Sequence, residues 1–228
     1  MNGVRRLPPP LGVGGQSRRA PFRAMLTART FARMDALAVV EKNLRAAIAV
    51  KEAVLADASA RRLIVDVAEA VVIAYRAGRK VFFCGNGGSA ADAQHLAAEL
   101  SGRYYYDRPP LFAEALHVNT SYITAVANDY SFDQIYSRWV SAIGQEGDVL
   151  FALSTSGNSE NVVRAVRQAE LNGMTTVGFT GADGGQLAEL CDFAFRAPSD
   201  DTPRMQELHM LAGHTICEIV EAQLFPRP

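Results

Sequence analysis

The sequence lacks the features of a membrane-bound or nucleic-acid-binding protein. Its 23 Lys and Arg residues nearly balance its 24 Asp and Glu residues, so the formal net charge is −1. Bulk charge therefore gives no reason to expect a nucleic acid or a membrane surface as a partner. No stretch approaches the ~18 consecutive apolar residues that a membrane-spanning helix needs.

Cysteine is also scarce. Cys84, Cys191 and Cys217 are odd in number and include no C-x-x-C pair. This pattern suits the reducing cytosol, where we expect each thiol to be a small buried apolar side chain. With 228 residues, 49% of them hydrophobic, the chain is long enough for one sizeable α/β core. These properties together favour a cytoplasmic globular protein.

The first thirty residues differ from the rest. They hold six arginines, no acidic residue, and a proline- and glycine-rich stretch that includes Pro8-Pro9-Pro10. Such a segment cannot bury enough apolar surface to order itself, so we expect residues 1–30 to be a disordered basic tail. It lacks the apolar core of a secretory signal. Two other interpretations of this segment remain. It could be an arm for targeting or for binding nucleic acid, or translation could really begin at Met25 or Met34.

Residues 31–228 are expected to form a single domain in two parts. Apolar residues recur at helical spacing over 31–55 and again over 61–76, where Gly78 ends the pattern. These helices, within residues 31–78, either cover the core or form an oligomer surface. From residue 79 onward, strand and helix patterns alternate and form the α/β core with a last helix.

The alternating patterns predict a parallel sheet. Strands are expected at 80–84, 114–118, 148–154, 175–181 and 193–197, and helices from 89, over 121–127, 132–143 and 160–171, and from the cap residue Thr202 to about 224. Strands that alternate with helices of this length predict an α/β fold whose sheet is covered on both faces. Ligands of such sheets bind at the carboxyl ends of the strands, where two glycine- and serine-rich turns lie.

The first of these turns fits a dinucleotide-binding fingerprint, G-x-G-x-x-A, in the sequence Gly85-Asn86-Gly87-Gly88-Ser89-Ala90. Such a site also needs an acidic residue at the end of a second strand about 20 residues on. Asp107 stands at roughly that distance, but it lies between "YYY" and an Arg-Pro-Pro stretch that is too proline-broken for a central strand. The missing partner disfavours a dinucleotide.

The second turn, Ser154 to Ser159 (STSGNS), carries four hydroxyl groups just before a helix. Hydroxyls and free N–H groups at a helix N-terminus form a cradle for phosphate. The turn contains no Lys or Arg, and the sequence has no G-x-x-x-x-G-K-[ST], which disfavours a nucleoside triphosphate with magnesium. One phosphomonoester suits the turn better. In the alternative, Ser159 only caps its helix, which accounts for one hydroxyl of the four.

Two titratable residues share one face of the alanine-rich helix after the first turn. Ser89 and Asp92 resemble a capping box that would begin this helix. His95 and Glu99 are four residues apart and therefore lie on one face. Their spacing fits either a solvent-exposed pair or a pair that points into a site. Their place one to two turns beyond a strand-end turn favours the site.

The last predicted helix adds candidates in "MQELHMLAGH". Gln206 and His214 are separated by roughly 12 Å of helical rise, so their spacing gives no clean metal signature. Both reach one ion only if Gln206 extends along the helix axis or the first turn is irregular. His209 is the weaker candidate, and His117, in a predicted strand, is expected to be structural.

Four segments in this order resemble one family. They are "CGNGGSAADAQHLAAEL", "ANDYSFDQIYSR", "LSTSGNSENVVRAV" and "MQELHMLAGHTICEIVE". They are similar to the bacterial phosphoheptose isomerases, or sedoheptulose 7-phosphate isomerases, which are single-domain members of the sugar isomerase (SIS) fold. The resemblance covers about residues 31–224. It implies a three-layer α/β sandwich with a five-stranded parallel sheet, preceded by N-terminal helices, in a homotetramer.

The resemblance also implies an activity and a set of site residues. The reaction is the isomerisation of sedoheptulose 7-phosphate to D-glycero-D-manno-heptose 7-phosphate, the first step toward nucleotide-activated heptose for lipopolysaccharide or other surface glycans. The catalytic pair would be Glu99 and His214. One zinc ion per subunit would be bound by His95, Glu99, Gln206 and His214. Substrate contacts would come from Asn86, Gly87, Gly88, Ser89, Asn128, Asp129, Ser154, Thr155, Ser156, Ser159 and Gln206.

The implied mechanism is proton transfer through an enediol, with Glu99 acting at carbon and His214 in the complementary acid/base role. A carboxylate bound to zinc is a weaker base, because the cation stabilises its charged form. Either the metal moves when substrate arrives, or Glu99 binds it through one oxygen and works with the other. Glutamine is an unusual zinc ligand, which makes Gln206 the least secure of the four.

Other functions predict different features. A non-catalytic SIS-fold protein, like those that associate with the bacterial replication initiator, would be expected to lack the acid/base residues, yet His95, Glu99 and His214 are all present. An isomerase of another sugar phosphate, such as arabinose 5-phosphate, usually carries extra regulatory domains, for which this chain has no room. A dehydrogenase would need the dinucleotide partner that the first turn lacks.

Overall fold

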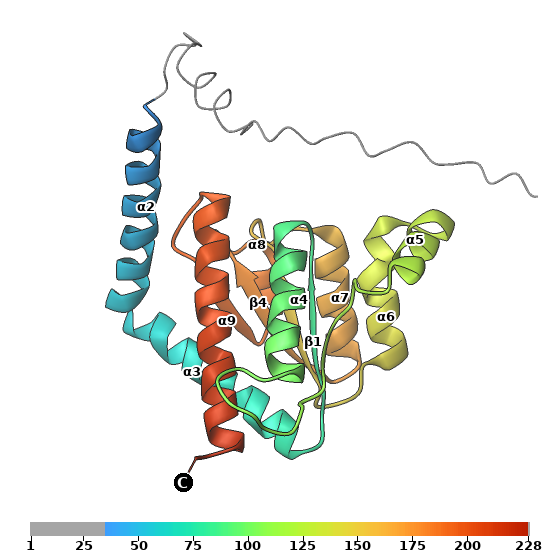
Figure 1. Cartoon of the computed structure of the whole chain (residues 1–228). Coiled ribbons are helices and arrows are strands. Elements are labelled where there is room, and N and C mark those ends of the chain that lie inside the picture. Colours follow the sequence, from blue (N-terminus) through green and yellow to red (C-terminus); the bar gives the residue numbers. More distant parts are fainter. Residues whose placement is uncertain (1–34, 228) are drawn as a thin grey trace, which may run out of the picture. The chain divides into compact units, whose positions relative to one another are not determined.

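The computed structural model describes residues 35–227 (Figure 1). The chain divides into two compact units, residues 1–41 and residues 42–228. Helix α2 (Ala36–Ala56) begins in the first unit and continues into the second, and all other described elements belong to the second unit. The predicted tail, residues 1–30, lies outside the described residues, so its disorder stays a prediction.

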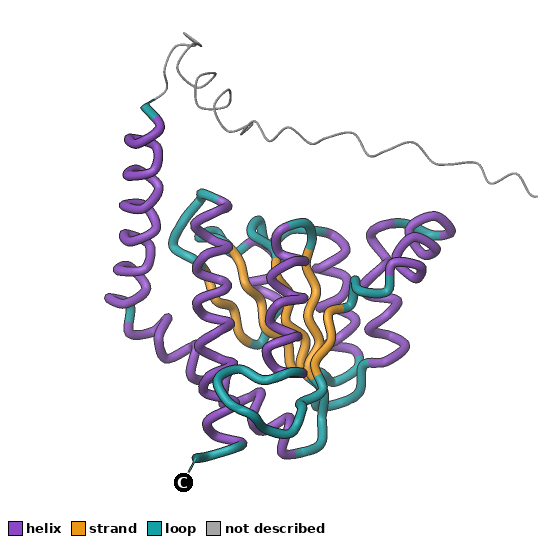
Figure 2. Tube along the Cα trace, in the orientation of Figure 1, coloured by secondary structure: helices purple, strands orange, loops and turns teal. Residues whose placement is uncertain are grey.

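A five-stranded parallel sheet forms the centre of the second unit and confirms the predicted fold class (Figure 2). The strands are β1 (Val81–Gly85), β2 (Ala113–Ala115), β3 (Val149–Leu153), β4 (Thr175–Thr180) and β5 (Phe193–Arg196), in the order β2-β1-β3-β4-β5. Strands β1 and β3 are buried along their whole length. They read as continuous apolar runs because helices cover both of their faces.

Helices cover the sheet on both sides and complete a three-layer sandwich. One layer contains α3 (Ala58–Arg76), α4 (Gly88–Ser101) and α9 (Thr202–Leu224). The other contains α5 (Thr120–Asp129), the 3-10 turn η1 (Phe132–Gln134), α6 (Ile135–Ile143), α7 (Glu160–Leu171) and α8 (Gly185–Leu190). Side chains alternate along β1, so Phe83 packs in the first layer and Phe82 in the second.

Several element ends differ from the prediction. Helix α3 begins at Ala58 rather than at residue 61, because the Asp57 side chain accepts hydrogen bonds from the N–H groups of Ser59 and Ala60. Strand β2 ends at Ala115, so His117 lies in the turn after it and not in a strand. The helix predicted over 132–143 begins as the 3-10 turn η1.

The predicted caps of two helices are wrong. The N-cap residue of α4 is Gly87, with φ +55°, and no side chain caps the helix. The glycine turn delivers the chain to the helix one residue earlier than predicted, so Ser89 is inside the helix and buried, and it forms no capping box with Asp92. Helix α9 has Asp201 as its N-cap residue and Thr202 as its first helical residue.

A buried ion pair ties the loop after α4 to α9. Arg108 Nε donates to Glu221 Oε2 over 3.1 Å, and the Glu221 carboxylate also accepts from the N–H groups of Tyr104 and Tyr105. Burial raises the pKa of Glu221, but these hydrogen bonds and the Arg108 charge outweigh it, so the pKa lies below its usual value. Arg108 also donates to the backbone carbonyl of Glu99, which fixes the end of α4.

All three cysteines are free thiols. Cys84 and Cys217 are buried as expected, Cys191 is half-buried, and burial raises the pKa of all three. Across residues 35–227, no helix is long and apolar enough to cross a membrane.

Candidate active site

Two turns follow neighbouring strands at the point where the strand order reverses. Strand β1 leads through Asn86 and Gly87 into α4, and strand β3 leads through residues 154–159 into α7. Because α4 and α7 lie on opposite faces of the sheet, the two turns leave the carboxyl edge of the sheet in opposite directions. This is the place where parallel α/β sheets bind ligands. The sheet therefore brings together the two turns that the sequence singled out.

The serine-rich turn gathers its hydroxyl groups. Ser154 Oγ lies 2.9 Å from Ser159 Oγ and 3.3 Å from Ser156 Oγ. Ser159 is the N-cap residue of α7, yet its side chain makes no capping hydrogen bond, so the simple capping interpretation is wrong. Gly157 has φ +64°, and a Cβ there would collide with the backbone carbonyl of Gly184. Only glycine fits this position, which holds the turn against the loop after β4.

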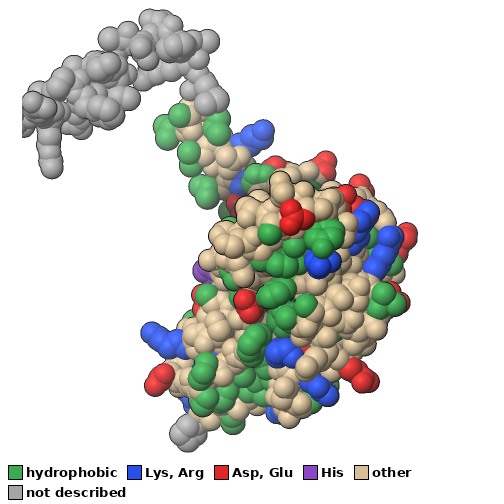
Figure 3. Space-filling model, turned by 90° about the vertical axis from the view of Figure 1, so that its right-hand side faces the viewer, with side chains coloured by type: hydrophobic (Ala, Val, Ile, Leu, Met, Phe, Trp, Pro, Cys, Tyr) green, Lys and Arg blue, Asp and Glu red, His purple; other side chains and the backbone are tan. Residues whose placement is uncertain are grey.

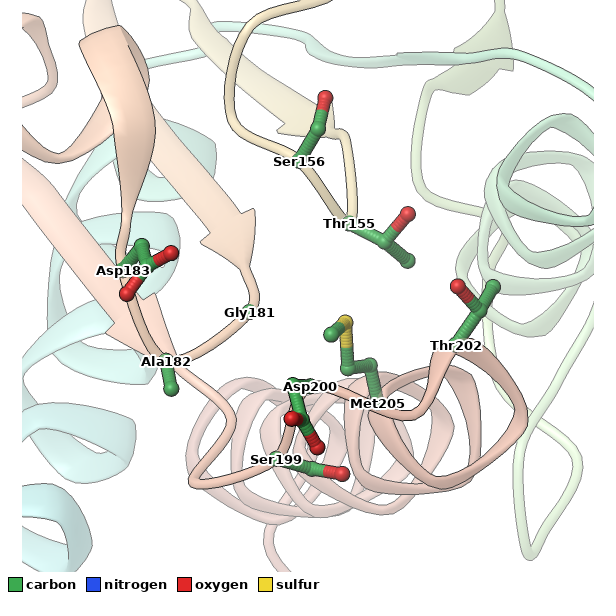
Figure 4. A pocket seen from close by; sticks show the side chains of 9 residues that line it. All are labelled: Thr155, Ser156, Gly181, Ala182, Asp183, Ser199, Asp200, Thr202 and Met205. Atoms are coloured by element: carbon green, nitrogen blue, oxygen red, sulfur yellow. The ribbon is translucent and has the colours of Figure 1, made fainter.

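A cavity of about 280 Å³ lies beside this turn (Figure 4). Its walls come from the segments after β3, β4 and β5 and from the start of α9: Thr155, Ser156, Gly181, Ala182, Asp183, Ser199, Asp200, Thr202 and Met205. The Met205 side chain reaches from α9 toward Gly181. Sequence reasoning missed the walls after β4 and before α9. The glycine-rich stretch after β4, also at a strand's carboxyl end, was the available signal.

Helices α4 and α9 pack side by side and bring three titratable side chains together (Figure 1). His95 Nε2 lies 3.0 Å from His214 Nε2 and 3.1 Å from Glu99 Oε1. One ligand atom from each of the three residues lies within 4.8 Å of the others. The side chains of His95 and Glu99 are 50% and 24% exposed, so a solute can reach them.

The chemistry of this cluster fits a zinc ion. Imidazole nitrogens and carboxylate oxygens are zinc ligands, and tetrahedral bonds of 2.0–2.1 Å place them about 3.4 Å apart. This is close to the 3.0 and 3.1 Å that separate His95 Nε2 from His214 Nε2 and from Glu99 Oε1. Burial and the neighbouring His95 lower the pKa of His214, and Glu99 opposes this only in part. A lowered pKa favours the neutral imidazole, which is the form that binds metals.

The Gln206 amide lies against the first turn, at Gly88. The amide packs so closely on Gly88 that a Cβ at that glycine would collide with Nε2 of Gln206. Gln206 is about two helical turns from His214 along α9. Gly88 therefore allows α9 to approach the start of α4, and the Gln206 amide lies beside the turn formed by Gly87 and Gly88.

The remaining predicted contacts are spread over two places. Asn86 pairs with Asn161 of α7 through two hydrogen bonds. Asn128 and Asp129 end α5, where Asn128 Nδ2 donates to Asp129 Oδ1 over 2.8 Å. Helix α5 packs mainly against η1 and α6. The substrate contact of Asn128 and Asp129 stays a prediction.

His209 has a structural place, consistent with its lower rank as a candidate. It is fully buried beside the rings of Phe179 and Phe195, and its Nε2 donates to the carbonyl of Thr180 over 2.9 Å. Burial lowers its pKa, and the hydrogen bond to Thr180 only partly opposes this. His117 is half-buried, and burial lowers its pKa as well.

We expect the free energy of unfolding to fall as the pH is lowered from 7 to 5. Burial lowers the pKa of folded His209, whereas the same residue in the unfolded chain takes up a proton near its usual pKa of about 6.5. The unfolded state then binds more protons, so stability falls by up to ~1.4 kcal/mol per pH unit for each such histidine. Urea unfolding at both pH values measures this. A His209→Gln variant with an undiminished pH effect would contradict the assignment.

The cluster and the serine-rich turn can be compared with known proteins. A family model described as SIS domain matches residues 43–181, more than half of the chain. The phosphoheptose isomerase of Clostridium acetobutylicum is 50% identical over 186 residues, which cover 82% of this chain and 95% of that protein. The chain belongs to the phosphoheptose isomerase family of SIS-domain proteins. The family resemblance of the four sequence segments is thereby confirmed.

Other phosphoheptose isomerases support the same family. That of Rhodospirillum rubrum is 57% identical over 161 residues, 71% of this chain and 86% of that protein. The structure of a phosphoheptose isomerase from Francisella tularensis matches with a TM-score of 0.77 and 37% identity, over 82% of this chain and 98% of that one. The structure from Neisseria gonorrhoeae gives 0.72 and 38%, over 82% and 96%.

Proposed function

We propose that this phosphoheptose isomerase family member converts sedoheptulose 7-phosphate to D-glycero-D-manno-heptose 7-phosphate. The observation that carries the proposal is the cluster of His95, Glu99 and His214 on α4 and α9, together with a hydroxyl-lined turn after strand β3, the neighbour of β1. Acid/base groups and a phosphate anchor are what a sugar-phosphate isomerase needs. A non-catalytic SIS-fold protein would have no use for the retained acid/base residues.

The substrate is proposed to span the two turns. Its phosphate binds the hydroxyls and N–H groups of the second turn, through Ser154, Thr155, Ser156 and Ser159. The N-terminus of α7 favours an anion there, because its free N–H groups carry partial positive charge. The sugar chain then runs past the turn at Gly87 and Gly88, where the Gln206 amide can bind hydroxyl groups. This orientation delivers the carbonyl end to Glu99.

The proposed reaction moves one proton between neighbouring carbons. Glu99 takes the proton from C1 of the ketose, and the electron pair of that bond forms the double bond of an enediol as the C2 carbonyl oxygen gains a proton. The proton held by Glu99 is then returned to C2, while the C1 oxygen loses its proton and becomes the aldehyde. His214 holds the proton that moves between the two oxygens. The atoms of substrate and product balance.

The zinc site is proposed at His95, Glu99 and His214, with Gln206 as the fourth candidate. When bound, zinc would polarise the substrate carbonyl. Glu99 turns Oε1 toward His95, which leaves Oε2 available as the base. This favours the arrangement in which one carboxylate oxygen binds the metal and the other takes the proton from carbon. The position of the Gln206 amide on Gly88 supports a sugar contact at the first turn.

Metal removal is expected to abolish most of the turnover. Purified protein is treated with a chelator, freed of it by dialysis, and incubated with sedoheptulose 7-phosphate while aldose formation is followed. Without zinc the substrate carbonyl is no longer polarised, so we expect little product. Product formation should return when one equivalent of zinc is restored. Mass spectrometry of the metal content provides the control. Undiminished turnover by metal-free protein would refute the zinc proposal. Absence of product under every condition would refute the proposed isomerase activity.

We also propose a homotetramer that contains part of α2 in its interfaces. Leu44, Ile48 and Leu55 of this helix are 60%, 55% and 68% exposed in the single chain. Apolar side chains in such a row are typical of a helix that packs against another subunit. A nucleic acid is not proposed as partner: on the face that Figure 3 shows, acidic and basic side chains are interspersed.

The product would serve the cell's heptose pathway in the cytoplasm. Substrate and product are charged sugar phosphates, which do not cross membranes unaided. We propose that the heptose 7-phosphate becomes nucleotide-activated heptose for lipopolysaccharide or other surface glycans.

A further inference from the structure

The side chain of Asn86 is held by a second amide that sequence reasoning did not single out. Asn86 Nδ2 donates to Asn161 Oδ1 over 2.8 Å, and Asn161 Nδ2 donates to Asn86 Oδ1 over 2.9 Å. Each amide thus uses one N–H and one C=O in a reciprocal pair. Asn161 is 2% exposed and belongs to the first turn of α7. A buried amide in this position needs its partner, because an unsatisfied one costs free energy.

The pair joins the two turns of the proposed site from opposite layers of the fold. Asn161 is two residues beyond Ser159, at the end of the phosphate turn. Asn86 directly precedes Gly87 and the next residue, Gly88, against which the Gln206 amide packs. Helix α7 covers one face of the sheet, and α4, which begins at Gly88, covers the other. Across the carboxyl edge of the sheet, the amide pair therefore connects the two turns directly.

A second hydrogen bond holds the same turn independently. The buried Tyr136 of α6 donates its hydroxyl to the carbonyl of Gly85 over 2.5 Å. The turn after β1 is thus fixed at Gly85 by Tyr136 and at Asn86 by Asn161. Loss of the amide pair alone leaves the hydrogen bond from Tyr136 to Gly85 in place. Such a loss should therefore loosen the turn without unfolding it.

We propose that Asn161 is a positioning residue for the isomerase reaction. By holding Asn86, it sets the separation between the phosphate turn and the turn at Gly87 and Gly88. A sugar anchored by its phosphate then has its carbonyl end at a fixed place relative to Glu99. Asn161 needs no contact with substrate for this and acts through Asn86. The inference rests on the proposed function, because that function defines the phosphate and carbonyl ends.

The test compares variants at the two ends of α7. Asn161→Ala removes the amide pair. We expect kcat to fall by about 10²-fold, the size of effect that a misplacement of about 1 Å produces. KM for sedoheptulose 7-phosphate should change little, because the phosphate contacts remain. Hydrogen–deuterium exchange should accelerate at the backbone amides of residues 86–90, which the lost pair no longer holds in place.

Asn172 offers a matched control. It ends the same helix, and its Nδ2 donates to the carbonyls of Val140 and Gly144, both over 3.0 Å. Asn172 Oδ1 also accepts from Gln168 Nε2, as Asn161 Oδ1 also accepts from the N–H of Val162. Each alanine variant therefore removes three side-chain hydrogen bonds, and Asn172 lies far along the helix from both turns. We expect Asn172→Ala to lower stability while kcat and the exchange of residues 86–90 stay as in the wild type.

Asn161→Asp is a second test of the positioning role, for the case in which Asn161→Ala does not fold. The carboxylate keeps the shape but has only acceptors, so Asn86 Oδ1 loses its donor. We expect the same fall in kcat and the same faster exchange. Equal kcat losses in the variants at 161 and 172, or wild-type kcat and exchange in Asn161→Asp, would overturn the proposal. Failure of the wild type to isomerise would refute the function, and the exchange measurement would still decide whether Asn161 holds Asn86.

Discussion

Replacement of Glu99 by glutamine is expected to lower kcat by ~10²–10⁴-fold, the contribution typical of a positioned general base. Glutamine keeps the size of the side chain and one carbonyl oxygen, but it cannot take the proton from carbon. The serine-rich turn is unchanged in this variant, so binding of sedoheptulose 7-phosphate should persist. Initial rates and calorimetric titration with the substrate measure the two effects separately.

The control for this variant lies on the neighbouring helix. Glu218 is an exposed residue of α9, one helical turn beyond His214. Glu218→Gln changes the net charge by the same amount near the cluster and should leave kcat near that of the wild type. The zinc content of both variants is measured, because loss of the Glu99 carboxylate also removes a proposed ligand. Near-normal kcat in Glu99→Gln would exclude Glu99 as the base.

Ser156→Asp is expected to raise KM for sedoheptulose 7-phosphate by about 10²-fold or more. Ser156 is exposed and lies in the proposed phosphate turn, with its Oγ 3.3 Å from Ser154 Oγ. A carboxylate beside a phosphate costs several kcal/mol, and each ~1.4 kcal/mol is tenfold in affinity. At saturating substrate, kcat should change much less, because the acid/base cluster is not altered.

Ser156→Asn isolates the charge in this experiment. Asparagine has nearly the shape of aspartate but no charge, so its KM should stay far closer to that of the wild type. Steady-state kinetics of the three proteins at one ionic strength measure the difference. A wild-type KM in Ser156→Asp would place the phosphate somewhere other than this turn.

The layered fold was predictable because its strongest signals are local. Strands β1 and β3 are apolar throughout, and helical spacing marks the segments between the strands. The helix ends were less predictable, because they depend on backbone angles. Gly87 adopts φ +55° and begins α4 without a side-chain cap, which a search for capping residues does not detect.

The parts of the candidate site were predictable, but their assembly was not. His95 and His214 are 119 residues apart in the chain, and only the packing of α4 on α9 brings their Nε2 atoms to 3.0 Å. The Asn86–Asn161 pair spans 75 residues and likewise has no local pattern. Gln206 was linked to the metal through the family resemblance, whereas its contact with Gly88 depends on how closely the two helices approach.

A crystal structure of the Glu99→Gln variant with sedoheptulose 7-phosphate would show where the substrate binds, because turnover is slow enough for the ligand to persist. We predict phosphorus within hydrogen-bonding distance of the hydroxyls of residues 154–159, with C1 and C2 beside the side chain at position 99. Density for the phosphate anywhere else, or for a sugar whose carbonyl end points away from α4, would contradict this prediction.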